Sequence, residues 1–215
     1  MLNFHSNYIL RYRLVCLLLS VGFFTYQFMI ANYENFGIQF RYLTIWGLTG
    51  ATISNYLLYR SKRNNLPEAY HAFVSAAAVL NAMVVFLYWR LYFIDPSLVN
   101  SSDSIVWFQE YYLHAVGPLL LILDALCFNK SFSQIKKGML TILVICLLYI
   151  FWTEALTAPL NSTPEGSVTN GFPYPFLNNM VLSERLKFYA TTILTGLGLY
   201  FLSWLLTKTK SLFSP

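Results

Sequence analysis

Residues 69–89 read AYHAFVSAAAVLNAMVVFLYW, and no charged side chain interrupts them. An α-helix rises about 1.5 Å per residue, so a segment of this length crosses the roughly 30 Å hydrocarbon core of a bilayer. Basic residues lie on both sides of the stretch, at Arg63 and Arg90. The stretch therefore predicts a membrane-spanning helix.

Five further stretches of the chain are similarly apolar. The stretch nearest the N-terminus, 14–33, has no Ala-x-Ala cleavage site and is longer than the core of a signal peptide. We therefore interpret it as a helix of the mature protein. Together with 69–89, the stretches predict an all-α fold: a polytopic integral membrane protein that is a bundle of six transmembrane helices in a single domain, 1–215. The other five predicted helices span 14–33, 42–59, 111–128, 138–156 and 188–207.

The composition supports this fold class. Hydrophobic residues make up 57% of the 215 residues and charged residues only 11%, against roughly 25% charged in a typical soluble domain. Too few charges remain to cover a soluble surface, so the partner of this chain is the lipid bilayer. The net charge of +5 comes without a basic stripe or a recognition motif, which argues against nucleic acid as a partner.

Basic residues are distributed unevenly between the two sides of the predicted bundle. Because cytoplasmic loops of membrane proteins are enriched in Lys and Arg, this bias predicts that both termini are cytoplasmic. Ten of the fourteen basic residues fall on that side: Arg11, Arg13, Arg60, Lys62, Arg63, Lys130, Lys136, Lys137, Lys208 and Lys210.

Several segments place polar side chains in one layer at the outer ends of the predicted helices. Thr44 opens one helix and His114 opens another, and a threonine hydroxyl needs a neighbouring base before it can act as a nucleophile. Glu110 lies four residues before His114 and can orient its imidazole from the same helix face. The alternative is a Thr44 bonded to its own helix and an interfacial His114. The same layer holds Arg90, Glu154 and Tyr174.

Other polar residues lie deeper in the predicted membrane. Asp124, Asn81 and Asn55 sit within apolar stretches, where interhelical hydrogen bonds are the favoured interpretation and a proton or ion path the alternative. Asp124 is about 15 Å along the helix from His114, too far to complete a triad with it.

Neither a metal nor a cofactor is expected. The three histidines, His5, His71 and His114, fall at different depths or ends of the predicted bundle and cannot share one ion. The longest predicted loop, 157–187, contains the aromatic and proline-rich run FPYPFL at 172–177, which we expect to lie at the interface as a lid or plug.

Four short stretches carry a family resemblance. They are YLT at 42–44, VVFLYWRLY at 84–92 followed by Asp95, LHAVGP at 113–118 continuing to Asp124, and YPFL at 174–177. In order and spacing they resemble the androgen-induced / androgen-dependent TFPI-regulating family of six-helix membrane proteins, over about residues 10–207. The pattern of His114, Pro118 and Asp124 is most similar to the compact prokaryotic branch of that family.

The resemblance implies a function. Animal members hydrolyse fatty-acid esters of hydroxy fatty acids with a threonine and a histidine inside the membrane, which here map to Thr44 and His114. We therefore expect an intramembrane hydrolase of long-chain acyl esters that needs no cofactor, located in a bacterial inner membrane, with its oligomeric state open. The alternative is a non-catalytic transporter or interaction protein centred on Asp124. Expected supporting residues are Glu110, Arg90, Glu154, Tyr174 and Asn178.

Overall fold

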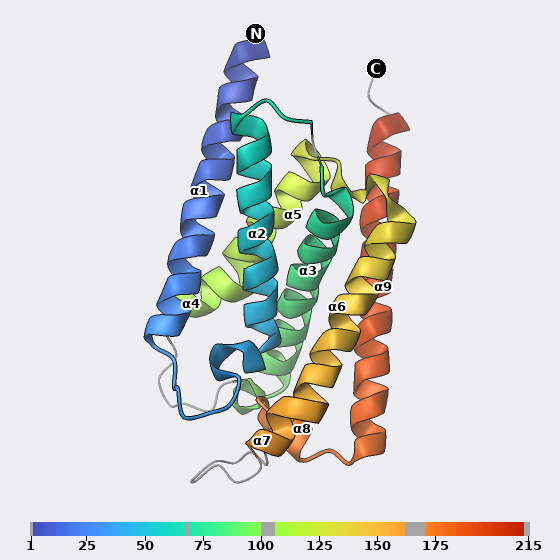
Figure 1. Cartoon of the computed structure of the whole chain (residues 1–215). Coiled ribbons are helices and arrows are strands. Elements are labelled where there is room, and N and C mark those ends of the chain that lie inside the picture. Colours follow the sequence, from blue (N-terminus) through green and yellow to red (C-terminus); the bar gives the residue numbers. More distant parts are fainter. Residues whose placement is uncertain (1, 68, 100–105, 162–170, 213–215) are drawn as a thin grey trace.

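The computed structural model describes residues 2–67, 69–99, 106–161 and 171–212 (Figure 1). These residues form helices and turns without a strand, so the predicted all-α fold is confirmed. The helices are α1 (Leu2–Met29), α2 (Leu43–Arg63), α3 (His71–Ile94), α4 (Trp107–Tyr111), α5 (Gly117–Leu123), α6 (Ile135–Phe151), α7 (Ala158–Leu160), α8 (Pro175–Asn178) and α9 (Leu182–Leu212).

Wider π-helical turns join successive α-helices into two longer continuous helices. Tyr112–Val116 joins α4 to α5, and Asp124–Phe128 continues α5. Trp152–Thr157 joins α6 to α7 in the same way. Such turns insert one residue into a helix and often occur at functional sites.

Five helical stretches of the described chain are long and apolar enough to cross a membrane, which fits an integral multi-pass membrane protein. A further long helix, α2, runs beside α1 and α3 (Figure 1). It is less apolar because it carries several threonines and Asn55, so its crossing of the membrane stays a prediction. The five stretches are Asn7–Met29, His71–Ile94, Trp107–Phe128, Ile135–Leu160 and Leu182–Lys208.

The predicted helix bounds need correction at several ends. Helix α1 covers Leu2–Met29 rather than 14–33, and α9 covers Leu182–Leu212 rather than 188–207. Apolar runs mark only the membrane-embedded part, whereas backbone hydrogen bonds carry a helix on into the polar interface. Helix α3 begins at His71, because Tyr70 adopts a positive φ of 64° that ends the preceding loop.

The predicted loop 157–187 is also shorter than expected. Its first residues continue the α6 rod as α7, α8 lies within it, and α9 begins at Leu182. Residues 162–170 of this predicted loop lie outside the described part of the chain.

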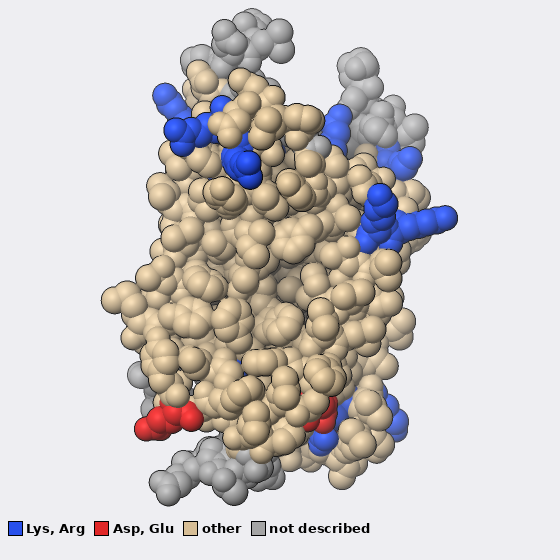
Figure 2. Space-filling model, in the orientation of Figure 1, with Lys and Arg blue, Asp and Glu red and all other residues tan. Residues whose placement is uncertain are grey.

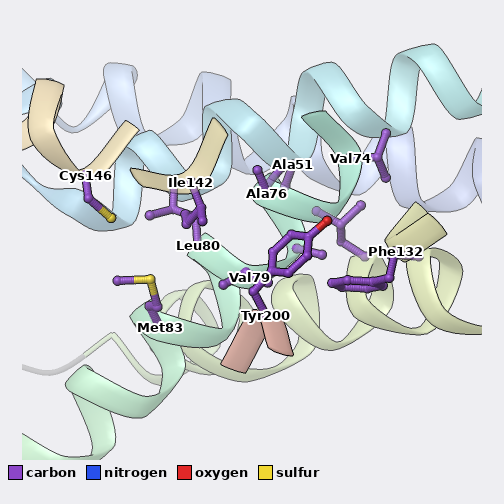
Figure 3. Close-up of a cluster of buried hydrophobic side chains, with 14 of the residues drawn as sticks. Ala51, Val74, Ala76, Val79, Leu80, Met83, Phe132, Ile142, Cys146 and Tyr200 are labelled. Atoms are coloured by element: carbon purple, nitrogen blue, oxygen red, sulfur yellow. The ribbon is translucent and has the colours of Figure 1, made fainter. Parts of the chain in front are cut away.

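Helix α3 lies at the centre of the bundle and packs against α2, α5, α6 and α9. Its buried face includes Ser75 and Ala76, small residues that let neighbouring helices approach closely. Tyr200 of α9 points toward the buried side chains of α3 (Figure 3), and its hydroxyl lies 2.9 Å from the Ser75 hydroxyl. Gly138 of α6 faces the same ring, where any added Cβ would overlap the Tyr200 hydroxyl.

Both chain ends lie at one end of the bundle, where α1 begins and α9 finishes (Figure 1). On the face shown in Figure 2, most Lys and Arg side chains gather toward that end, and the acidic side chains lie near the opposite end. The middle of this face is an uncharged band, as a bilayer requires. The cytoplasmic location of both termini stays a prediction.

Arg13 corrects the sequence analysis. We expected it among the charges of a cytoplasmic N-terminal segment, but it lies inside α1 and is only 2% exposed. Its Nε and Nη2 donate to the two carboxylate oxygens of Asp124 at 2.8 and 2.9 Å, and its Nη1 donates to Leu58 O at 3.2 Å. The partner of Asp124 is therefore Arg13, rather than Asn81 or Asn55, because α1 brings a guanidinium to a buried carboxylate that needs a counter-charge.

Candidate functional site

The structure brings Thr44 and His114 into contact. Thr44 is the second residue of α2, and its Oγ1 lies 3.3 Å from Nε2 of His114, which belongs to the π-helical turn Tyr112–Val116. The imidazole is buried, whereas Thr44 is half-buried and remains reachable. Two segments distant in the sequence thus form a hydroxyl and imidazole pair with the geometry of a nucleophile and its base.

Glu110 completes a row of three side chains. Its Oε2 lies 3.0 Å from His114 Nδ1, the ring nitrogen that does not face Thr44, as a contact between charges rather than an aligned hydrogen bond. A carboxylate at Nδ1 favours the tautomer that carries its proton there, which leaves the lone pair of Nε2 facing the threonine hydroxyl. The same carboxylate stabilises the imidazolium that forms when His114 accepts a proton.

Two aromatic residues of α3 hold His114 in place. The Tyr88 ring stacks on the imidazole with centroids 3.6 Å apart and planes at 6°. The Trp89 indole donates a hydrogen bond of 2.7 Å to the His114 carbonyl oxygen. In an α-helix this carbonyl would accept from the residue four positions on, but that residue is Pro118, which has no N–H. Trp89 therefore supplies the donor that the helix lacks.

An apolar chamber of about 80 Å³ opens beside Thr44. Its lining is almost entirely apolar and suits hydrocarbon. Residues that line it include Leu43, Thr44, Met83, Val84, Leu87, Tyr88, Leu91, Val99, Cys146, Tyr149, Ile150, Tyr174, Phe176, Leu177, Phe188, Tyr189, Thr192 and Ile193. We call this space the chamber.

Tyr174 reaches the chamber wall next to Thr44. Its Oη accepts a hydrogen bond from the Leu43 N–H at 3.1 Å, at the first residue of α2. Burial raises the pKa of Tyr174 to about 12, because the phenolate would lose its hydration. The phenol therefore keeps its proton at physiological pH and can act as a hydrogen-bond donor toward the chamber.

Asn178 fastens the loop that presents Tyr174. Its Nδ2 donates to Phe172 O at 3.2 Å and to Tyr174 O at 3.0 Å, and its Oδ1 accepts from Phe172 N at 3.1 Å. Asn178 is not among the residues that line the chamber. The aromatic and proline-rich run predicted as a lid contributes Tyr174, Phe176 and Leu177 to the chamber wall.

Glu154 and Arg90, also expected to support the site, lie farther from it. Glu154 binds Arg185 through both carboxylate oxygens, at 2.7 and 3.1 Å, and accepts a 2.9 Å hydrogen bond from Tyr189. Tyr189 is the only one of these that lines the chamber. Arg90 is exposed and does not line it.

Sequence reasoning missed the contributions of Tyr88, Trp89 and Tyr149. The sequence did contain a signal for the Trp89 hydrogen bond: Pro118, four residues after His114, leaves the His114 carbonyl without its usual helical donor. Tyr149 lines the chamber, and its hydroxyl donates a hydrogen bond of 2.9 Å to the Arg41 carbonyl oxygen. This hydrogen bond fixes the turn before α2. Among the described residues, no group of three His, Cys, Asp or Glu side chains could hold a metal ion.

Fold and site together define an all-helical integral membrane protein with a row of Thr, His and Glu side chains beside an apolar chamber. The model of the FAR-17a/AIG1-like protein family matches residues 8–208, so the chain belongs to this family. The resemblance to the androgen-induced family is thereby confirmed, and placement in its prokaryotic branch stays a prediction. Comparison with curated proteins and with solved structures finds no match.

Proposed function

We propose that this protein is an intramembrane hydrolase of long-chain acyl esters, such as fatty-acid esters of hydroxy fatty acids. The contact between Thr44 Oγ1 and His114 Nε2 carries the proposal, because it pairs a nucleophile at the wall of an apolar chamber with a base. No cofactor is required by this chemistry. The bacterial inner membrane as its location is part of the same proposal.

The reaction has two halves. His114 Nε2 takes the proton of Thr44 as Oγ1 attacks the ester carbonyl carbon, and the imidazolium then gives that proton to the departing alkoxide oxygen. This breaks the ester bond, releases the alcohol half and leaves an acyl group on Thr44. Water then attacks the same carbon, His114 takes its proton, the bond to Oγ1 breaks, and the proton returns to Thr44 as the fatty acid leaves.

The negative charge that develops on the carbonyl oxygen needs donors. One is the Thr44 N–H, which lies in the first turn of α2, where N–H groups lack intrahelical acceptors. No acceptor in the described residues reaches it. The second is the protonated hydroxyl of Tyr174, which borders the same stretch of the chamber.

The lining of the chamber sets the substrate class. Leucine, valine, isoleucine and phenylalanine side chains bury hydrocarbon at about 25 cal/mol per Å² of apolar surface removed from water. A long acyl chain gains much from such a wall and a short one gains little. The preferred substrates are therefore esters with long acyl chains that enter from the surrounding lipid.

The alternative, a transporter or interaction protein centred on Asp124, has less support. Both oxygens of Asp124 are engaged by Arg13, which gives this buried charge a role in holding α1 to the rest of the bundle. Neither residue lines the chamber.

Hydrolysis by purified protein in detergent tests the proposal. The substrate is a palmitoyl ester of a hydroxystearic acid, and released palmitate is measured by mass spectrometry. We expect wild type to be active and Thr44→Ala and His114→Ala each to lose at least about a hundredfold in kcat, in line with removal of a nucleophile or base.

Matched controls separate chemistry from folding. Thr49→Ala removes another α2 threonine, which bonds Ile45 O in its own helix, and His71→Ala removes a histidine at the start of α3. Both should retain most activity. Full activity in Thr44→Ala or His114→Ala would overturn the site, and an inactive wild type across several acyl esters would overturn the hydrolase assignment.

A further inference from the structure

A second, much smaller cavity also borders Thr44. It has room for roughly one water molecule and is too small for an acyl chain. Among the described residues, Thr44 is the one that lines both this cavity and the chamber. We call this space the rear cavity, and its lining is Thr44, Leu48, Ala51, Asn55, Asn81, Tyr112, Leu113, Gly117 and Pro118.

The two cavities differ in chemistry. The chamber wall is mostly hydrocarbon, whereas the rear cavity contains the amide side chains of Asn55 and Asn81. Both asparagines are more than nine-tenths buried, at 6% and 4% exposed. Amides are costly to bury in a membrane protein unless their polar atoms find partners.

The hydrogen bonds that these amides make run through their nitrogens. Asn81 Nδ2 donates to Gly47 O at 2.9 Å and to Ala77 O at 2.8 Å. Asn55 Nδ2 donates to Cys16 O at 3.3 Å and to Ser20 Oγ at 3.2 Å. Because each nitrogen faces acceptors, the amide orientation is determined. No donor in the described part of the chain reaches either Oδ1.

A buried acceptor with no protein donor is commonly satisfied by a water molecule. Two such acceptors in a cavity of this size, next to a threonine hydroxyl, offer a water the partners that it needs. The second half of the proposed reaction consumes one water, and the apolar chamber filled by an acyl chain is a poor route for it.

We propose that the rear cavity is a water site that supplies the hydrolytic water to acyl-Thr44, with Asn81 and Asn55 as positioning residues. The inference rests on the proposed function. Water approaches the acyl carbonyl carbon from the rear cavity. It donates one hydrogen to an asparagine Oδ1 and the other to His114, so a lone pair of its oxygen is free to attack the carbon. Its oxygen bonds to the carbonyl carbon, its proton passes through His114 to Thr44 Oγ1, and the fatty acid leaves.

The test separates the two halves of the reaction. A p-nitrophenyl palmitate probe reports acylation as a burst of p-nitrophenolate and turnover as the steady rate that follows. Asn81→Leu removes the acceptor at similar volume. We expect its burst to stay within about threefold of wild type and its steady rate to fall at least tenfold, while intact-protein mass spectrometry shows one palmitoyl group accumulating on Thr44.

Two further variants make the test robust to folding defects. Ala51→Val adds methyl groups to the rear cavity wall without removing a hydrogen bond, and it should give the same separation of burst and steady rate. Ser54→Ala, on the same helix, is the matched control: Ser54 is fully buried but does not line the rear cavity, and both phases should be unchanged.

The outcomes distinguish the inference from its premise. If wild type shows neither burst nor turnover, the proposed function fails and the water site falls with it. If wild type turns over and Asn81→Leu and Ala51→Val lower burst and steady rate equally, or lower neither, the hydrolase stands and the water site is wrong. Loss of the steady rate with acyl-enzyme accumulating supports it.

Discussion

The indole of Trp89 donates a hydrogen bond of 2.7 Å to the carbonyl oxygen of His114, at the position of that helix where Pro118 removes the usual donor. The hydrogen bond links α3 to the π-helical turn that carries the imidazole. It also explains why a proline so close to His114 leaves the helix continuous rather than broken, since the orphaned carbonyl has found another partner.

Replacing Trp89 by phenylalanine keeps a ring and removes the donor. The buried carbonyl then lacks a partner, which costs about 1–3 kcal/mol, and His114 loses one of its two contacts with α3. We expect a lower midpoint of thermal unfolding in detergent and a kcat reduced about tenfold. Trp204→Phe, near the far end of α9, is the control and should keep the kcat.

A double variant tests the explanation itself. Pro118→Ala restores an N–H four residues after His114 and offers the carbonyl an intrahelical donor. In the Trp89→Phe background this change should recover part of the lost stability. Equal loss with and without Pro118→Ala would mean that the Trp89 hydrogen bond is not what compensates for the proline.

Glu110→Gln tests the third member of the row. Glutamine keeps the size of the side chain but removes the charge that stabilises the imidazolium and favours the proton on Nδ1. We expect kcat to fall at least tenfold with KM little changed, because the substrate does not meet this side chain. Initial rates over a range of substrate concentrations measure the split, and the exposed Glu34→Gln serves as the control.

Tyr174→Phe removes the hydroxyl next to Thr44 but not the ring that lines the chamber. Because this hydroxyl stabilises the developing oxyanion, we expect kcat to fall about 10- to 100-fold, somewhat less than the roughly 100- to 1,000-fold loss typical for removal of one oxyanion-hole donor. Tyr200→Phe removes another buried hydroxyl, remote from the site, and should leave kcat intact. An unchanged kcat in Tyr174→Phe would assign the oxyanion to other donors.

The pKa of Tyr174 adds a pH criterion. An ordinary tyrosine loses its proton near about pH 10, whereas burial raises the pKa of Tyr174 to about 12. The neutral phenol is the donor. A raised pKa keeps Tyr174 protonated to a higher pH than an ordinary tyrosine. The ratio of wild-type kcat to Tyr174→Phe kcat should therefore stay constant up to about pH 10. A ratio that falls toward one between pH 8 and 10 would contradict a protonated Tyr174 donor.

Much of this architecture follows from the sequence for a simple reason. A bilayer demands long uncharged helices, so uninterrupted apolar runs locate them, and counting residues from the ends of those runs places Thr44 and His114 at the same depth. Contacts between helices carry no such signal. That Thr44 and His114 face one another, and that Tyr88 stacks on the imidazole, depends on helix rotation and on π-helical turns that no periodicity reveals.

Arg13 shows the limit most clearly. A basic residue just before an apolar run is usually a flanking charge at the membrane surface, and only the crossing of α1 with the rod that carries Asp124 reveals its buried partner. The helix bounds erred for a related reason, because α1 continues through Arg11 and Arg13 toward its first residues.

The Arg13 and Asp124 pair yields the final prediction, which separates structure from transport. Asp124→Leu leaves the buried Arg13 without its carboxylate, and Arg13→Met leaves the buried Asp124 without its guanidinium. We expect each single variant to lose about 3–5 kcal/mol in unfolding free energy, because each strands a buried charge. The double variant Arg13→Met with Asp124→Leu strands none and should recover much of that loss. Unfolding in detergent measures all four members of the cycle, while ester hydrolysis per folded molecule should stay near the wild-type value in the double variant. If the double variant is as unstable as the singles, the pair does more than satisfy its own charges. If it folds well but loses hydrolysis, Asp124 takes part in function, and the alternative centred on it regains weight.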